Sequence, residues 1–227
     1  MYEKMKISEL ITKELKPGSA CLILSSPLAG REQFIRQLFY ESLFSNYAAI
    51  YVTTDNFADD IIKYIETLGY ELKDREYVFI DTYSQQANPA LEDSENIKYV
   101  ASVADLAKLS NNIVSSLGKL TKKSSLLIFN SLDTLLMHVS PQSVYRFLYY
   151  LRAKTRFAST TSLLMLDPKL HDEKVIKMIC QLSDVLININ EERNLLELTF
   201  ASSLKKAIKY NIGKKGFVLQ QKLFILA

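Results

Sequence analysis

The sequence predicts an α/β fold in which a mostly parallel central sheet has helices on both faces. Short apolar runs alternate with longer segments whose apolar residues recur at helical spacing. This alternation favours right-handed crossovers between parallel strands. The run at 126–129 is wholly apolar, which is typical of a strand buried on both faces of such a sheet.

The strands of the first half are short apolar runs bounded by turn residues, and the helices show apolar residues three and four positions apart. The first strand follows a Lys-Pro-Gly-Ser turn. In chain order, we expect a helix at 7–15, a strand at 20–24, a helix to residue 44, a strand at 49–53, a helix closed by Gly69, and a strand at 77–81.

A polar stretch at 83–96 follows the third strand. It contains Pro89 and several acidic residues, so we expect a mobile surface loop here.

Helix starts in the second half carry residues suited to capping. Ser140 and Asp172 are expected N-caps, Pro141 suits a first helical position, and Asp105 begins a further helical pattern. We expect helices at 105–117, 141–157 and 173–182, with strands at 125–130, 161–166 and 185–189.

The C-terminal part departs from this alternation. Residues 195–200 and 216–220 have strand patterns on either side of a Lys-rich segment at 205–209. We therefore expect the sheet to end in an antiparallel edge or hairpin.

Composition limits the class of protein. The chain has 227 residues, of which 48% are hydrophobic and 23% charged, and its formal net charge is +3. These values exclude a disordered chain and give no general attraction to nucleic acid, so such a site would have to be a local patch. The length suits one large core, and we expect a single domain over residues 1–227.

The two cysteines lie in apolar surroundings without partners at metal-ligand spacing. We expect Cys21 and Cys180 to be buried free thiols in a reducing compartment. There is no signal-peptide core and no apolar run of about 20 residues that would span a membrane. The expected location is the cytoplasm, with no membrane contact.

The segment 25–32 has the outline of a phosphate-binding loop between a strand and a helix. In the pattern G-x-x-x-x-G-K-S/T, glycines let backbone N–H groups approach phosphates, Lys contacts the outer phosphates and Ser/Thr binds Mg²⁺. Here Ser25 stands at the first Gly position, Leu28 falls within the loop, and Gly30 keeps the second Gly position. Arg31 replaces Lys, and Glu32 replaces Ser/Thr.

Two interpretations of this loop remain open. It is either a plain strand-to-helix turn, in which Glu32 stabilises the helix start by about 0.3–1 kcal/mol, or a nucleotide pocket that works without metal. A carboxylate at Glu32 would also occupy the anion site at this helix start. Asp55, Asn130 and Asp167 follow other predicted strands, and they would meet the loop where ligands of parallel sheets bind.

Three stretches together resemble the RecA-like P-loop ATPases, and in particular archaeal KaiC-like and RadA-related proteins. Residues 16–19 with 30–32 resemble the lead-in to the P-loop, residues 51–62 the second strand and helix, and residues 126–132 the Walker B strand, which usually ends in Asp-Ser-Leu. The resemblance spans residues 7–190. It implies a RecA-like P-loop fold and a vestigial nucleotide site of Ser25, Leu28, Gly30, Arg31, Glu32, Asp55, Asn130 and Ser131.

The working parts of that site are altered. Phosphoryl transfer requires the protein to bind the phosphates, to hold a metal ion and to position the attacking water. Glu32 removes the metal-binding hydroxyl, Asn130 replaces the Walker B Asp, and Asp55 leaves one carboxylate where the family has two. We therefore expect no catalytic residues and no cofactor. The alternative is weak ATP binding or hydrolysis that uses Arg31 and Asp55.

The expected function is that of a catalytically inactive RecA/KaiC-like homologue that regulates or assembles with other proteins. The resemblance implies a homo-oligomer, or a hetero-oligomer with an active relative. The alternative function is a KaiC/RadA-type ATP-binding protein or ATPase, with a role as an accessory of DNA recombination or repair.

Two other groups of side chains have simple structural interpretations. Asp167, His171, Asp172 and Glu173 have metal-binding side chains, but adjacent residues rarely converge on one ion, so we expect no metal. Tyr and Arg on one face of the helix at 141–157 suit a protein or nucleic-acid interface, or an ordinary solvated face. Lysines near the C-terminus suit phosphate binding or protection of a sheet edge. The candidate interface residues are Tyr145, Tyr149, Arg152, Arg156, Lys205, Lys206 and Lys209.

Overall fold

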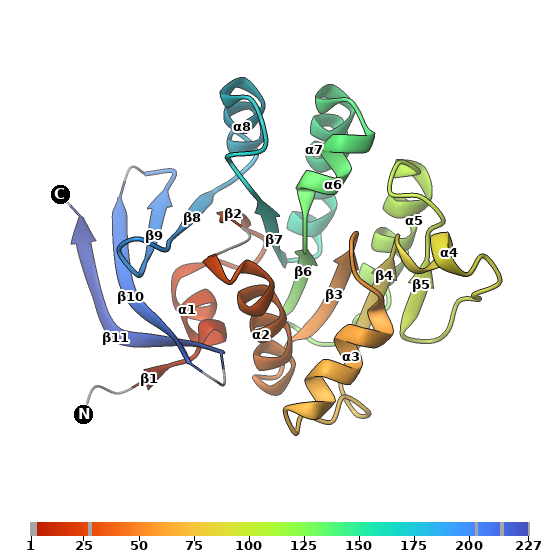
Figure 1. Cartoon of the computed structure of the whole chain (residues 1–227), viewed down its shortest axis with the longest axis horizontal. Coiled ribbons are helices and arrows are strands. Elements are labelled where there is room, and N and C mark those ends of the chain that lie inside the picture. Colours follow the sequence, from red (N-terminus) through yellow and green to blue (C-terminus); the bar gives the residue numbers. More distant parts are fainter. Residues whose placement is uncertain (1–3, 27–28, 203, 214–215, 227) are drawn as a thin grey trace.

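A central sheet runs through the computed structural model, which describes residues 4–26, 29–202, 204–213 and 216–226 (Figure 1). Within these residues the sheet has the strand order β1-β11-β10-β9-β8-β2-β7-β6-β3-β4-β5. The strands are β1 (Lys4–Met5), β2 (Ala20–Leu24), β3 (Ala48–Thr53), β4 (Tyr77–Asp81), β5 (Ile97–Tyr99), β6 (Ser125–Phe129), β7 (Thr160–Leu166), β8 (Val185–Asn190), β9 (Leu195–Phe200), β10 (Lys205–Gly213) and β11 (Gly216–Leu226).

Strands β2 to β8 pair in parallel, and β9, β10, β11 and β1 continue the sheet in antiparallel pairing. The expected α/β fold with a mostly parallel sheet and an antiparallel C-terminal part is thereby confirmed. Strand β2 lies between β7 and β8, with Cys21 opposite Leu163 on one side and Val185 on the other.

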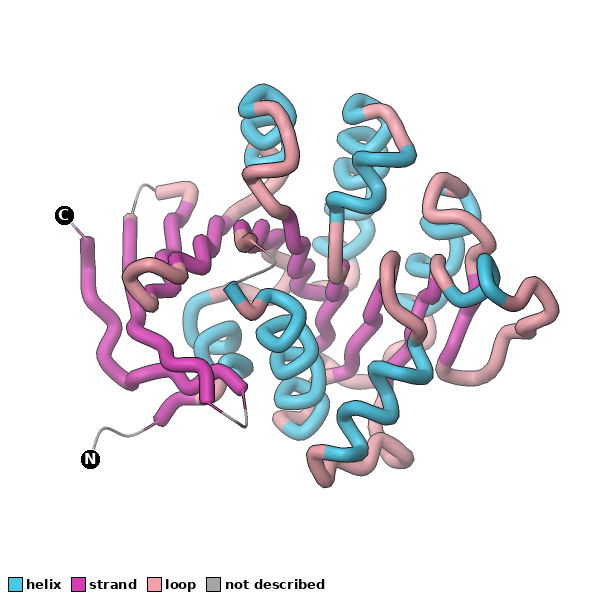
Figure 2. The backbone as a smooth tube through the Cα atoms, in the orientation of Figure 1, coloured by secondary structure: helices cyan, strands magenta, loops and turns pink. Residues whose placement is uncertain are grey.

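Helices cover both faces of the sheet, as the tube in Figure 2 shows. Buried side chains of α1, α2 and α3 form one hydrophobic cluster, and those of α5, α6, α7 and α8 form another. The helices are α1 (Ile7–Glu14), α2 (Arg31–Phe44), α3 (Ala58–Thr67), α4 (Ser84–Ala87), α5 (Leu106–Leu117), α6 (Leu132–His138), α7 (Pro141–Phe157) and α8 (Glu173–Cys180).

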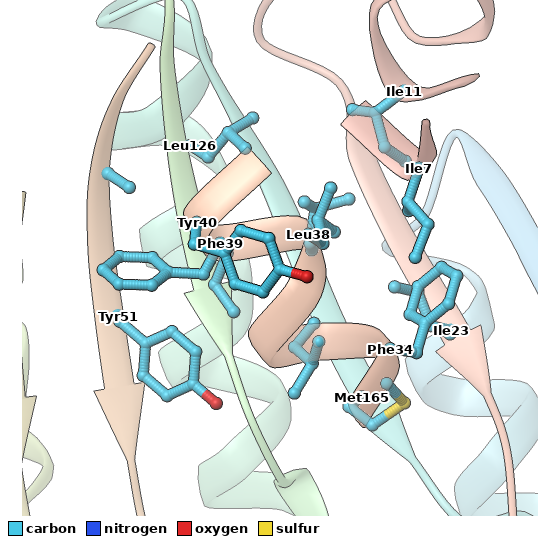
Figure 3. Close-up of a cluster of buried hydrophobic side chains, with 14 of the residues drawn as sticks. Ile7, Ile11, Ile23, Phe34, Leu38, Phe39, Tyr40, Tyr51, Leu126 and Met165 are labelled. Carbon is cyan, nitrogen blue, oxygen red and sulfur yellow. The ribbon is translucent and has the colours of Figure 1, made fainter. Parts of the chain in front are cut away.

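The cluster under α2 contains most of the largest buried aromatic rings. The ring of Phe39 packs edge-on against Tyr51 and Phe79, with centroids 5.2 Å apart in both pairs. Figure 3 shows Phe34, Leu38 and Phe39 of α2 directed at the sheet. This packing fixes α2, and with it the loop that precedes the helix.

Of the two expected helix caps, the one at Ser140 is confirmed, and Asp105 caps α5 as well. Asp105 Oδ1 accepts the N–H of Lys108 at 2.9 Å, and Ser140 Oγ accepts the N–H of Ser143 at 3.3 Å. Asp172 occupies the N-cap position of α8, but its side chain makes no capping hydrogen bond. The expectation that Asp172 caps this helix through its carboxylate is therefore wrong.

The structure also contains elements that the sequence patterns did not indicate. Strands β1 and β5 and helix α6 were not expected, and the Lys-rich segment is itself part of strand β10. The polar stretch at 83–96 is partly helix α4, and Asp93 within it accepts the N–H of Tyr99 at 2.8 Å. This stretch is therefore partly helical and hydrogen-bonded to β5.

Both cysteines are free thiols. Cys21 is fully buried, whereas Cys180 is only partly buried, so the expected burial holds for one of them. Burial raises the pKa of both thiols above the ordinary value. Across the described residues, the structure contains no helix with the length and apolar character needed to cross a membrane.

Candidate functional site

A pocket of about 230 Å³ lies where β3 and β6 end and α2 begins. Its position at the carboxyl ends of parallel strands is where ligands of such sheets bind. The pocket brings together four residues of the predicted vestigial site from three separate segments. It is lined by Arg31, Glu32, Ile35, Asp55, Asn56 and Asn130.

The remaining residues of the predicted site lie outside this pocket. Ser25 is buried, its hydroxyl donates to the carbonyl of Ser26, and it lines a different pocket of about 210 Å³ together with Asp167. Ser131 is buried at the N-cap of α6. Leu28 lies outside the described residues.

Gly30 forms the start of α2 in a left-handed conformation, with a φ of +73°. A Cβ atom at Gly30 would lie 3.0 Å from Ile212 Cδ1 and 3.1 Å from the ring of Phe217. Only glycine adopts this φ without strain, and here it also permits close packing. The hairpin of β10 and β11 therefore packs directly against the loop, a contact that no local sequence pattern indicated.

Arg31, which the sequence resemblance matches to the P-loop Lys, has its charge already paired. Its Nη1 lies 2.6 Å from Asp133 Oδ2, and the two side chains are only 15% and 4% exposed. Asp133 stands in the first turn of α6. A buried guanidinium with such a partner is held more firmly than an exposed one.

The second oxygen of Asp133 is also engaged. Asp133 Oδ1 accepts the backbone N–H of Asp167 at 2.9 Å, and it lies 2.9 Å from His171 Nε2. The carboxylate thereby joins Arg31 of α2 with the segment after β7. Sequence reasoning missed Asp133, although a carboxylate two residues after Ser131 was a visible signal.

Asn130, which the sequence resemblance matches to the Walker B Asp, is hydrogen-bonded to the segment that follows β3. Its Nδ2 donates to Asp55 Oδ1 at 2.5 Å, and its Oδ1 accepts the N–H and hydroxyl of Thr54, both at 3.1 Å. Asp55 Oδ1 also accepts from Asn56 Nδ2 at 2.7 Å. The polar groups on this side of the pocket therefore bond to one another.

Glu32 does not turn back to the free N–H groups at the start of α2. Its side chain is 55% exposed and forms an ion pair with Arg36, four residues along the helix. Arg36 also donates to Asn56 at 3.3 Å. The expectation that Glu32 fills the anion site at this helix start is therefore wrong, because Arg36 offers a charged partner on the same helix face.

The metal-binding side chains after β7 do not converge. His171 faces Asp133, while Glu173 pairs with Lys177 along the exposed face of α8. In the part of the chain that the structure describes, no group of three or more His, Cys, Asp or Glu side chains could hold a metal ion.

The residues predicted as an interface are divided between two places. Tyr145 and Tyr149 of α7 stack with centroids 6.4 Å apart, and Tyr149 is 63% exposed. Arg152 is paired with Asp184 at 2.7 Å. The charge of Arg152 is therefore already paired within the chain, whereas Tyr149 is exposed to solvent.

The remaining predicted interface residues lie at the C-terminal end of α7 and on β10. Arg156 and Lys206 line the same pocket, at the edge where β2 and β8 begin. Lys206 is paired with Glu14 at 2.7 Å, whereas Lys205 and Lys209 are exposed on β10.

The comparisons with known proteins agree with this fold. The model of a family described as a family of unknown function (DUF7504) matches residues 18–189. No curated protein matches the chain. Among solved structures, a KaiC-like protein, PH0186, from the hyperthermophilic archaeon Pyrococcus horikoshii OT3 is similar, with a TM-score of 0.63 at 15% identity. The match covers 96% of this chain and 99% of that one.

Proposed function

Because this chain belongs to a family of unknown function (DUF7504) and shares the RecA-like fold of a KaiC-like protein, we propose that it is a pseudo-ATPase of the archaeal KaiC-like branch. In this proposal a single domain over residues 1–227 has lost ATP turnover. It acts through protein partners, as a regulatory or assembly subunit in the cytoplasm.

The ion pair between Arg31 and Asp133 is the observation that carries this proposal. A P-loop cation has to reach an incoming phosphate, but Arg31 is held by a nearly buried carboxylate 2.6 Å away. Releasing Arg31 would remove the guanidinium partner of a nearly buried carboxylate, which is costly. Among the described residues that line the pocket, no cation is therefore available to a nucleotide.

The rest of the pocket supports the same conclusion. Its volume of about 230 Å³ is below the range of about 300–1,000 Å³ that is usual for small-molecule sites. Of the two carboxylates in the lining, Glu32 is paired with Arg36, and Asp55 has no ion-pair partner among the described residues. The unpaired charge of Asp55 repels the triphosphate, and Asn130 supplies no charge to hold Mg²⁺.

The experiment is isothermal titration of the full chain with ATP and with ADP, each with and without Mg²⁺. We expect no binding at micromolar nucleotide and no phosphate release above the rate without protein. Micromolar affinity that depends on Mg²⁺ would contradict the proposal and favour the weak ATPase.

A restoring variant tests the ancestry of the pocket. Arg31→Lys, Glu32→Thr and Asn130→Asp together return the cation, the hydroxyl and the carboxylate of an active site. We expect nucleotide affinity to rise at least about tenfold over the wild type, a gain of about 1.4 kcal/mol. Arg146→Lys with Asp172→Asn, at exposed positions outside the pocket, serves as the control. No gain would favour a plain structural turn.

The assembly part of the proposal is supported by exposed apolar side chains on α6 and α7. Met137 is 66% exposed and Tyr149 is 63% exposed. Light scattering after size exclusion measures the mass of the purified chain, alone and mixed with a RecA-like ATPase from the same organism. A mass that stays at 25.9 kDa in both samples would contradict assembly.

A further inference from the structure

We propose that the pocket at the opposite edge of the sheet, where β2 and β8 begin, binds a small organic anion with an apolar body. Its volume of about 550 Å³ is more than twice that of the candidate nucleotide pocket. It falls within the range of about 300–1,000 Å³ that is usual for small-molecule sites. The site lies between the turn before β2, the end of α7 and the facing ends of β9 and β10.

Two cations at this pocket are available to a ligand. Lys16 and Arg156 are exposed, and neither has an ion-pair partner within the described residues. The acidic side chains of the lining are already neutralised. Glu14 pairs with Lys206 and Asp184 pairs with Arg152, both at 2.7 Å.

The carboxylate of Asp184 is further occupied by the protein backbone. Its Oδ2 accepts the N–H of Ala20 at 2.9 Å, at the start of β2. The uncompensated charge of the pocket is therefore positive, and an anionic group is the complementary ligand.

Part of the pocket lining is apolar. It is formed by Phe200, Val185 and Leu204, and the ammonium group of Lys206 lies 5.6 Å from the centre of the Phe200 ring. A ring or hydrocarbon chain placed against this wall would lose contact with water, which favours binding. A purely inorganic anion would leave these apolar side chains without a ligand contact.

The turn before β2 holds the two free cations at one pocket. Gly18 has a φ of +79°, and a Cβ atom there would lie 3.3 Å from the carbonyl oxygen of Arg156. The turn is closed by the N–H of Ser19, which donates to the carbonyl of Lys16 at 3.0 Å. The close approach at Gly18 therefore brings the ends of two distant segments together.

Fluorescence of the full chain with 8-anilinonaphthalene-1-sulfonate tests this site, because the probe joins a sulfonate to aromatic rings. The uncharged probe N-phenyl-1-naphthylamine has the same rings without the anion. We expect saturable binding of the sulfonate probe that weakens as KCl is raised. We expect the uncharged probe to bind at least about tenfold more weakly, since each 1.4 kcal/mol of ionic interaction is tenfold in affinity.

The double variant Lys16→Gln with Arg156→Gln removes both charges, and Gln at 156 keeps the Cγ atom that packs on Gly18. We expect its affinity for the sulfonate probe to fall at least about tenfold, with little change for the uncharged probe. Arg146→Gln, an exposed cation on the same helix α7, is the matched control and should bind as the wild type does.

A double variant that binds the sulfonate probe like the wild type would overturn the proposal. An equal loss in Arg146→Gln would also overturn it, because the effect would then come from overall charge. Phe200→Leu tests the apolar wall and should weaken both probes. Since the site is remote from the candidate nucleotide pocket, these outcomes do not depend on whether ATP binds.

Discussion

Asp133 links three parts of the candidate site through one buried carboxylate. It contacts Arg31, His171 and the backbone N–H of Asp167, and its side chain is 4% exposed. Local sequence patterns placed Arg31, Asp55 and Asn130 at neighbouring strand ends, because strand ends can be read from apolar runs. They did not identify Asp133, because its partners are distant in sequence. Asp167 and His171 lie about 35 residues after it and Arg31 about 100 residues before it, so they come together only in the folded chain.

Asp133→Asn should lower the free energy of unfolding by about 3–5 kcal/mol, because it leaves the nearly buried Arg31 without its counter-charge. Unfolding in urea, followed by circular dichroism, measures the change. Glu32→Gln is the control: it breaks a largely exposed pair and should cost about 1 kcal/mol or less. Equal losses in the two variants would show that the Arg31 pair is no more important than a surface pair.

At the scale of elements, the long helices and buried strands follow the sequence pattern closely. Strand β2 and helix α7 have the expected bounds, because an apolar run between turns and a Ser-Pro start are strong local signals. The two-residue β1 and three-residue β5 are too short to show any period. Strand β10 was missed because its lysines interrupt the apolar pattern formed by the buried residues Ala207, Ile208 and Tyr210.

Ser140→Ala should destabilise the protein by about 1 kcal/mol, because the Ser140 hydroxyl accepts the N–H of Ser143 at the start of α7. Thermal unfolding by differential scanning calorimetry measures this loss. Asp172→Ala is the matched variant at the start of α8, where the side chain makes no capping bond, and its effect should be clearly smaller. A larger effect at Asp172 would contradict this account of the two caps.

Across the whole molecule, the C-terminal hairpin is joined to α2 by a buried amide. Gln37 Nε2 donates to the carbonyl of Phe217 at 2.8 Å, and Gln37 Oε1 accepts the N–H of Phe217 at 2.7 Å. Gln37 also donates to Glu41, which in turn accepts the N–H of Ser8 in α1. The antiparallel part of the sheet is thus connected to the parallel part by polar as well as apolar contacts.

Gly216→Ala should loosen this connection. Gly216 has a φ of +111°, and a Cβ atom there would collide with Gln37 Oε1. Residues other than glycine in such a conformation cost about 1–3 kcal/mol. Hydrogen exchange should accelerate about tenfold in β10 and β11, as a loss of about 1.4 kcal/mol implies, while β3 and β6 remain protected.

Gly118→Ala is the control for this variant, since a Cβ atom there meets nothing closer than 3.6 Å and its φ is −70°. Unchanged exchange in β10 and β11 of Gly216→Ala would show that Gln37 can move aside.

The contact between Gly30 and the hairpin has a consequence for the order of folding. Ile212 and Phe217 are translated about 180 residues after Gly30, so the ribosome has made nearly all of the described chain before they can pack on this loop. Strand β2 likewise cannot pair in the sheet until its two neighbours, β7 and β8, have been synthesised. Contacts of such long sequence separation slow folding. The loop that opens α2 is therefore synthesised early and acquires its final neighbours late.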